Sequence, residues 1–161
     1  MIGSPGAGKS TFARALAEAT RLPLVHLDAH YHLPGWTEPD PEVWDEKLGQ
    51  LIGAESWIID GNYGSSLPLR LTRADTVVLL DYSTPLCLWR LARRLVRWRG
   101  QVRPDAPPGC FEKLDWEFVH YIFAFRRTKL PKVETDLDQF HGQVLRFARP
   151  RAAQAFLDSL S

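Results

Sequence analysis

The stretch Gly3-Ser4-Pro5-Gly6-Ala7-Gly8-Lys9-Ser10 matches the pattern G-x-x-x-x-G-K-[ST] at every fixed position. Glycines at this spacing allow a sharp turn in which successive backbone N–H groups point inward and hold phosphate oxygens. In this pattern the lysine reaches the β- and γ-phosphates of a nucleotide, and the hydroxyl of Ser10 binds Mg²⁺. The stretch therefore predicts a phosphate-binding loop that uses ATP and Mg²⁺.

The residues on either side of this loop differ in how well they fit it. Residues 9–20 are good helix formers with apolar side chains at helical spacing, and Pro23 follows them, so a helix is expected to begin at the loop. Only Met1 and Ile2 precede the first glycine, whereas a strand of about five residues is usual there. We expect either a native start roughly four residues upstream or a stunted central strand.

Beyond the first helix, apolar strands alternate with helical stretches, which predicts a parallel α/β sheet within a single domain, 1–161. The predicted strands are 24–27, 57–60, 76–80 and 144–147. The predicted helices are 42–53, 85–98, 112–127, 133–140 and 151–160. Residues 29–41 and 100–110 contain prolines and glycines and are predicted to be irregular.

Composition limits the class of protein. The 161 residues are 45% hydrophobic and 24% charged, which is typical of a globular chain, and no apolar run is long enough to span a membrane. No export or organelle signal is evident, so a cytoplasmic protein is expected. Cys87 and Cys110 are predicted to be packing residues. Residues 1–84 hold 6 Lys and Arg against 11 Asp and Glu, and residues 85–161 hold 14 against 8, so an acidic half precedes a basic half.

Three carboxylates follow predicted strands, at the sheet edge where α/β proteins place their ligands. Asp60 is the predicted Mg²⁺-binding carboxylate, with Asp81 as the alternative. Asp28 is predicted to orient or deprotonate a phosphate acceptor, the alternative being a solvated loop acid. Asp28 also alternates with three histidines, and in an extended segment these side chains could instead bind a transition metal. The histidines are His26, His30 and His32.

Six arginines and no lysine lie between residues 90 and 103, which favours bidentate phosphate binding over general solubility. Four of them share one face of the predicted helix 85–98, and Arg94 is assigned to nucleotide binding; a solvated helix face is the alternative. The four are Arg90, Arg93, Arg94 and Arg97. Downstream aromatic side chains could stack on a base, or could form core. These are Trp116, Phe118, Tyr121, Phe123 and Phe125.

Taken together, the motifs resemble the adenylate-kinase-like branch of phosphate-loop kinases, and more closely a small bacterial family labelled DNA topology modulation proteins. The matching pieces are Gly3 to Thr11, Leu27-Asp28, Leu33 to Trp36, Trp57 to Tyr63, Arg99-Gly100, Arg103 to Asp105 and Asp115 to Phe118. The resemblance implies a three-layer fold with a five-stranded parallel sheet, order 2-3-1-4-5, its first strand truncated here, and an arginine-bearing lid at about 99–112. The Pro-Arg that nucleotide kinases carry after Asp60-Gly61 is replaced by Asn62-Tyr63-Gly64.

The sequence thus predicts an ATP- and Mg²⁺-dependent phosphotransferase that acts on a small molecule or a nucleotide. The predicted catalytic residues are Lys9, Asp28, Asp60, Arg99 and Arg103. The predicted nucleotide-binding residues are Gly3, Ser4, Pro5, Gly6, Ala7, Gly8, Lys9, Ser10, Thr11 and Arg94, and the predicted metal ligands are Ser10 and Asp60. A nucleotide-switched nucleic-acid-binding protein and a simple ATPase are the alternatives.

Overall fold

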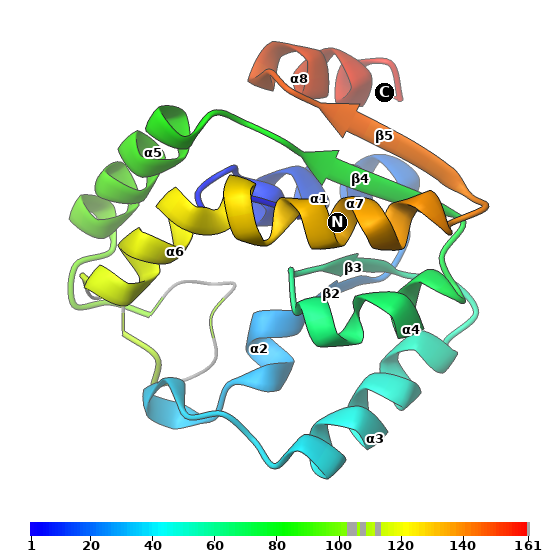
Figure 1. Ribbon diagram of the computed structural model, residues 1–161, viewed down its shortest axis with the longest axis horizontal. Coiled ribbons are helices and arrows are strands. Elements are labelled where there is room, and N and C mark those ends of the chain that lie inside the picture. Colours follow the sequence, from blue (N-terminus) through cyan, green and yellow to red (C-terminus); the bar gives the residue numbers. More distant parts are fainter. Residues whose placement is uncertain (103–105, 107–108, 112–113, 161) are drawn as a thin grey trace.

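The computed structural model describes residues 1–102, 106, 109–111 and 114–160. Helices and strands alternate along the chain, as Figure 1 shows. The strands are β1 (Ile2–Gly3), β2 (Leu24–His26), β3 (Ile58–Asp60), β4 (Thr76–Leu80) and β5 (Gln143–Phe147). The helices are α1 (Lys9–Thr20), α2 (Leu27–Tyr31), α3 (Pro41–Gly53), α4 (Leu67–Leu71), α5 (Thr84–Arg97), α6 (Trp116–Thr128), α7 (Leu130–Asp138) and α8 (Pro150–Asp158), with 3₁₀ turns η1 (Pro34–Trp36) and η2 (Gly64–Ser66).

All strand pairs are parallel, but they form two sheets: β1-β4-β5 and β2-β3. The described structure thus differs from the expected single five-stranded sheet: β1, β4 and β5 form a three-stranded sheet, and β2 and β3 form a separate pair. The reason is the length of β1, because two residues pair with Leu79 and Leu80 of β4 and leave little backbone for β3. Two hydrogen bonds bridge the gap: the amino group of Met1 donates to the Ile59 carbonyl (2.7 Å), and the Gly61 N–H donates to the Met1 carbonyl (3.3 Å).

Helices cover both faces of β4, which explains its unbroken Val/Leu sequence. Val78 and Leu80 pack among side chains of α1, α5 and α8, whereas Val77 and Leu79 pack among those of α4, α6 and α7. In Figure 1, α6 and α7 cross in front of the strands, and α1 lies behind them. A third cluster joins α3 to the β2-β3 pair through Trp44, Leu48 and Ile59. The α/β class with a parallel sheet is confirmed.

Helix α1 and strand β4 have the predicted bounds, several other elements are shifted by one to three residues at an end, and three segments differ more. The segment 29–41, predicted to be irregular, begins within α2, and α4 was not predicted at all. Helix α6 begins at Trp116, where the Asp115 side chain accepts hydrogen bonds from the N–H groups of Glu117 and Phe118. Both cysteines are buried, as predicted for packing residues. Within the described residues, no helix is long and apolar enough to cross a membrane.

Candidate functional site

The loop between β1 and α1 depends on glycine at two positions. Gly6 has φ 81°, and a Cβ there would lie 2.4 Å from the Cys87 carbonyl oxygen at the start of α5. A Cβ on Gly3 would lie 2.3 Å from the Leu80 carbonyl oxygen of β4. The loop is thus pressed against two elements, and α1 begins directly after it at Lys9. The first N–H groups of a helix have no acceptor within the helix, so this end suits an anion.

The Lys9 side chain folds back over the loop. Its Nζ donates hydrogen bonds to the carbonyl oxygens of Gly3 (3.0 Å) and Ser4 (3.3 Å). Removal of water from the ammonium lowers the Lys9 pKa, an effect that the nearby Asp60 and Asp28 carboxylates partly oppose. The predicted lysine is therefore at the mouth of the loop, held by neutral carbonyls that an incoming phosphate can replace.

Asp60 ends β3 beside the start of α1. Its side chain is only 5% exposed, and its Oδ2 lies 3.0 Å from Nδ1 of His26 at the end of β2. Burial alone would raise the Asp60 pKa, but the His26 hydrogen bond, the Lys9 charge and the Ser10 hydroxyl together hold it below its usual value. The other oxygen, Oδ1, is buried without a hydrogen-bond partner in the described structure. An ionised carboxylate with one unused oxygen next to Ser10 fits a hard cation such as Mg²⁺.

The alternative metal carboxylate, Asp81, is engaged elsewhere. Its Oδ2 accepts a hydrogen bond from the Arg146 guanidinium of β5 (2.6 Å), and its Oδ1 lies 3.4 Å from Nε of Arg126 on α6. Asp81 is 8% exposed, and these two arginines take up its charge. The geometry thus favours Asp60 over Asp81 as the carboxylate nearest the loop.

The turn after β3 is fixed by contacts that the sequence did not reveal. Asn62 Oδ1 accepts a hydrogen bond from the Gly3 N–H (3.0 Å), which connects this turn to the loop 3–8. Arg70 of α4 is 4% exposed, and its guanidinium donates to the carbonyls of Gly61, Asn62 and Tyr63 at 2.9, 2.5 and 3.2 Å. One signal could have identified Arg70: it is the single charged residue in the apolar run Leu67-Pro68-Leu69-Arg70-Leu71.

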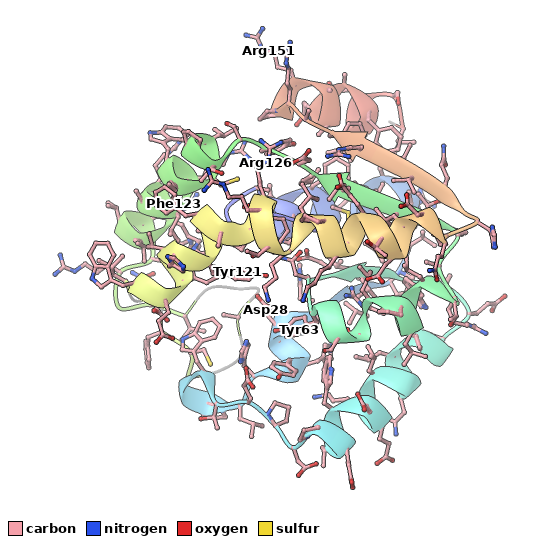
Figure 2. The ribbon with its side chains drawn as sticks, in the orientation of Figure 1. Asp28, Tyr63, Tyr121, Phe123, Arg126 and Arg151 are labelled. Carbon is pink, nitrogen blue, oxygen red and sulfur yellow. The ribbon has the colours of Figure 1, made fainter. Side chains whose placement is uncertain are left out.

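Asp28 lies on α2, not in an extended segment. Its Oδ1 accepts a hydrogen bond from the Tyr63 hydroxyl (2.8 Å), and burial and the Asp28 charge raise the pKa of Tyr63. Figure 2 shows Asp28 and Tyr63 below Tyr121 of α6. The pKa of Tyr121 is raised mainly by burial, and the Asp28 charge also raises it. Because α2 is helical, the period-two alternation assumed for a transition-metal site does not exist, and that alternative was wrong. The described residues contain no group of three or more His, Cys, Asp or Glu arranged for a metal ion.

The arginines of α5 line the site, though not all in the same way. Arg90 donates from Nη1 to the Ala7 carbonyl (2.6 Å) and lies over the Tyr82 ring, so it supports the loop from behind. Arg94 lies over Phe118, 5.5 Å from the ring centroid, and its charge lowers the Lys9 pKa. Arg99 is exposed in the turn after α5 and does not line the cleft, and Arg103 lies outside the described residues, as does much of the predicted lid.

These groups open onto one cleft of about 1800 Å³. The loop 3–8 and Asp60 form its floor, α5 and α6 form one wall, and α2 with the segment up to Glu38 forms another. Of the predicted stacking aromatics, Phe118 and Tyr121 line the cleft, Phe125 is buried core, and Trp116 and Phe123 are exposed. Base stacking by Phe118 or Tyr121 stays a prediction.

Neither a scan against protein-family models nor a search of curated proteins gives a match for this chain. The site therefore has to be interpreted from its own chemistry. Glycine-dependent backbone, a helix N-terminus, a lysine at the loop mouth and a carboxylate with a free oxygen converge on one point. That combination suits a polyphosphate with a divalent cation.

Proposed function

We propose that this protein is an ATP- and Mg²⁺-dependent phosphotransferase acting on a small molecule or nucleotide. The observation that carries the proposal is the meeting of Lys9, Ser10 and Asp60 at the head of α1, inside a cleft large enough for two substrates. Phosphoryl transfer asks a protein mainly for positioning and neutralisation of charge, and these groups provide both.

Each part of the site has a role in this proposal. The loop 3–8, the first N–H groups of α1 and the Lys9 ammonium bind the β- and γ-phosphates. Ser10 and Asp60 hold Mg²⁺, and His26 fixes the orientation of the Asp60 carboxylate. The metal would supply positive charge that neutralises the phosphate oxygens.

An arginine beside the transferring group stabilises its charge in many such sites. Of the arginines, Arg94 fits this role best, because it lines the cleft and its charge helps to lower the Lys9 pKa, which burial lowers most. Arg99 is exposed away from the cleft, so its assignment to the same role stays a prediction, as does that of Arg103.

The finer fold assignment is part of this proposal. We infer that the two sheets belong to one sheet of order 2-3-1-4-5, joined at Met1, whose backbone exchanges hydrogen bonds with both sides of Asp60. That order is the one implied by the resemblance to adenylate-kinase-like kinases and DNA topology modulation proteins. It would place the phosphate-binding loop between β3 and β4, at the edge where α/β proteins bind ligands.

The decisive experiment measures ADP production from ATP and Mg²⁺ with a panel of nucleosides, nucleotides, sugars and other metabolites. The proposal expects ADP that depends on an added acceptor, together with a phosphorylated product. ADP release indifferent to every acceptor would instead support a simple ATPase. Salt-sensitive DNA or RNA binding that persists without ATP, with no transfer to any acceptor, would support the nucleic-acid-binding alternative. Arg90 and Arg94, which are half-buried and line the cleft, argue against that alternative.

A further inference from the structure

One wall of the cleft carries almost no positive charge. Between Leu22 and Leu69, the stretch that contributes α2, η1 and the turn after β3, the single Lys or Arg is Lys47. Its Nζ donates to the His30 carbonyl at 2.7 Å on the outside of the molecule. The next cation along the chain, Arg70, is buried against three backbone carbonyls. This wall therefore offers no cation to a phosphate group.

The same wall carries carboxylates instead. Asp28 and Glu38 both line the cleft. Glu38 interacts with Tyr31. Burial raises the Tyr31 pKa most, and the charge and hydrogen bond of Glu38 raise it further. Burial lowers the His32 pKa, and the Asp28 charge partly opposes this effect. Burial also raises the pKa of Tyr121 across the cleft, and the Asp28 charge acts in the same direction. A phosphate ester placed here would meet negative charge, which is unfavourable.

Aromatic rings fill the space around these carboxylates. Tyr31 lies 4.6 Å from Tyr63, and His32 lies 5.2 Å from Trp36, between ring centroids. The opposite side is completed by two rings of α6. The rings that line this part of the cleft are those of Tyr31, His32, Trp36, Tyr63, Phe118 and Tyr121. Such a surface binds a flat ring system by stacking.

The arginines that line the cleft lie on α1 and on the α5 side of the other wall. Four arginines of α5 line the cleft. The charge of one of them, Arg94, affects the Lys9 pKa, which places Arg94 near the proposed binding site of the phosphate donor. The cleft is thus divided: phosphates fit between the loop and α5, and an uncharged aromatic compound fits between α2 and α6.

From this division we infer that the phosphate acceptor is an unphosphorylated, nucleoside-like alcohol, an aromatic ring carrying a hydroxylated substituent, and not a nucleoside monophosphate or another phosphate ester. The inference rests on the proposed function. In the transfer step the acceptor hydroxyl oxygen bonds to the γ-phosphorus of ATP while the bond from that phosphorus to the β–γ bridging oxygen breaks, and ADP leaves with that oxygen. The hydroxyl proton passes to Oδ2 of Asp28, to which no described residue hydrogen-bonds, while Tyr63 holds Oδ1.

The test compares matched acceptors: adenosine, guanosine, cytidine and thymidine against their 5′-monophosphates, with ADP and phosphorylated product both measured. At least one nucleoside should show a kcat/KM ten-fold or more above that of its monophosphate. Higher kcat/KM for the monophosphates, or no transfer to any nucleoside, overturns the inference. Transfer to some other acceptor would leave the proposed function standing, whereas ADP release without any acceptor dependence would remove both.

A charge reversal on the acidic wall provides a second readout. Glu38→Lys, at an exposed position that lines the cleft, should raise the monophosphate-to-nucleoside ratio of kcat/KM at least five-fold. Glu46→Lys on α3 makes the same change at an exposed position outside the cleft lining and is the matched control. An equal effect of both variants, or none of Glu38→Lys, contradicts the assignment of this wall to the acceptor.

Discussion

Nδ1 of His26 lies 3.0 Å from Oδ2 of Asp60, and this contact joins the carboxyl ends of β2 and β3. Because the Asp60 pKa is held below its usual value, the carboxylate is ionised and can only accept, so Nδ1 carries the proton. The histidine therefore fixes one carboxylate oxygen, while the other, Oδ1, has no hydrogen-bond partner in the described structure.

Replacing this histidine should weaken metal binding before it affects the fold. In His26→Phe the Asp60 carboxylate loses its orienting donor, so we expect the Mg²⁺ concentration for half-maximal activity to rise about ten-fold or more. The measurement is a Mg²⁺ titration of the phosphotransferase reaction. His141→Gln, at an exposed position far from the site, is the control and should leave the titration unchanged.

Removing the Lys9 ammonium should abolish transfer with little effect on the fold. In Lys9→Ala we expect kcat to fall roughly 10²- to 10³-fold or more, because the charge on the transferring phosphate is no longer neutralised. Circular dichroism should remain that of the wild type, since within the described residues the Lys9 ammonium donates its hydrogen bonds to two carbonyls of its own loop. Lys47→Ala removes an exposed lysine from α3 and should retain full activity. Unchanged turnover in Lys9→Ala would contradict the proposed function.

Two glycine-to-alanine substitutions should have opposite effects on stability. Gly6→Ala places a Cβ 2.4 Å from a backbone oxygen at a positive φ, so we expect a loss of about 2 kcal/mol or more in the free energy of unfolding. Gly49→Ala, in the middle of α3 where the new Cβ meets nothing within 4 Å beyond the adjacent backbone of its own helix, should gain about 0.5–1 kcal/mol. Urea unfolding of both variants tests the loop conformation without any ligand.

Arg70 should be essential for stability despite being a charged residue. Arg70→Met leaves the buried carbonyls of Gly61, Asn62 and Tyr63 without their donor, and we expect a loss of about 2–4 kcal/mol. Arg73→Met, three residues along at an exposed position with one long contact, should change stability by less than about 0.5 kcal/mol. Similar unfolding midpoints for the two variants would contradict the positioning role of Arg70.

Two histidines should make stability fall in mild acid. Burial lowers the pKa values of His30 and His32 below 6.5, so the unfolded chain binds protons more readily than the folded protein. Stability is therefore complete above pH 6.5 and decreases as the pH falls from 6.5 through the folded pKa values. The decrease should stay below about 1 kcal/mol, because both rings are partly exposed. The measurement is urea unfolding at pH 7.5 and 5.5, where the double variant His30→Gln/His32→Gln should show a smaller difference.

Local signals made part of this structure predictable from the sequence. The bounds of α1 and β4 follow from helical spacing ended by Pro23 and from an unbroken Val/Leu run. The placement of Asp60 beside the phosphate-binding loop follows from its position at the end of a strand. For α1 and β4 the deciding pattern lies within a few residues along the chain.

The features that sequence reasoning missed depend on contacts distant in sequence. Helix α2 has only five residues, and the alternating histidines in and beside it suggest an extended segment. The contacts of Tyr31 with Trp44 and Tyr63, which accompany the helix, are not visible in the local sequence. The role of Arg90 arises from a carbonyl 83 positions away. The strands are separated into two sheets because β1 is short. Its sequence alone does not show this, because the pairing of β1 depends on the positions of β3 and β4.

The division of the cleft into an acidic and a basic wall also acts before any contact is made. Under the proposed function, the substrate is a nucleoside triphosphate that carries its charge at one end. The field between the two walls would exert a torque on it in solution and turn its phosphates toward α5. Molecules that arrive already oriented bind more often per collision. Added salt shortens the reach of this field, and it would slow the capture of ATP while changing its release much less.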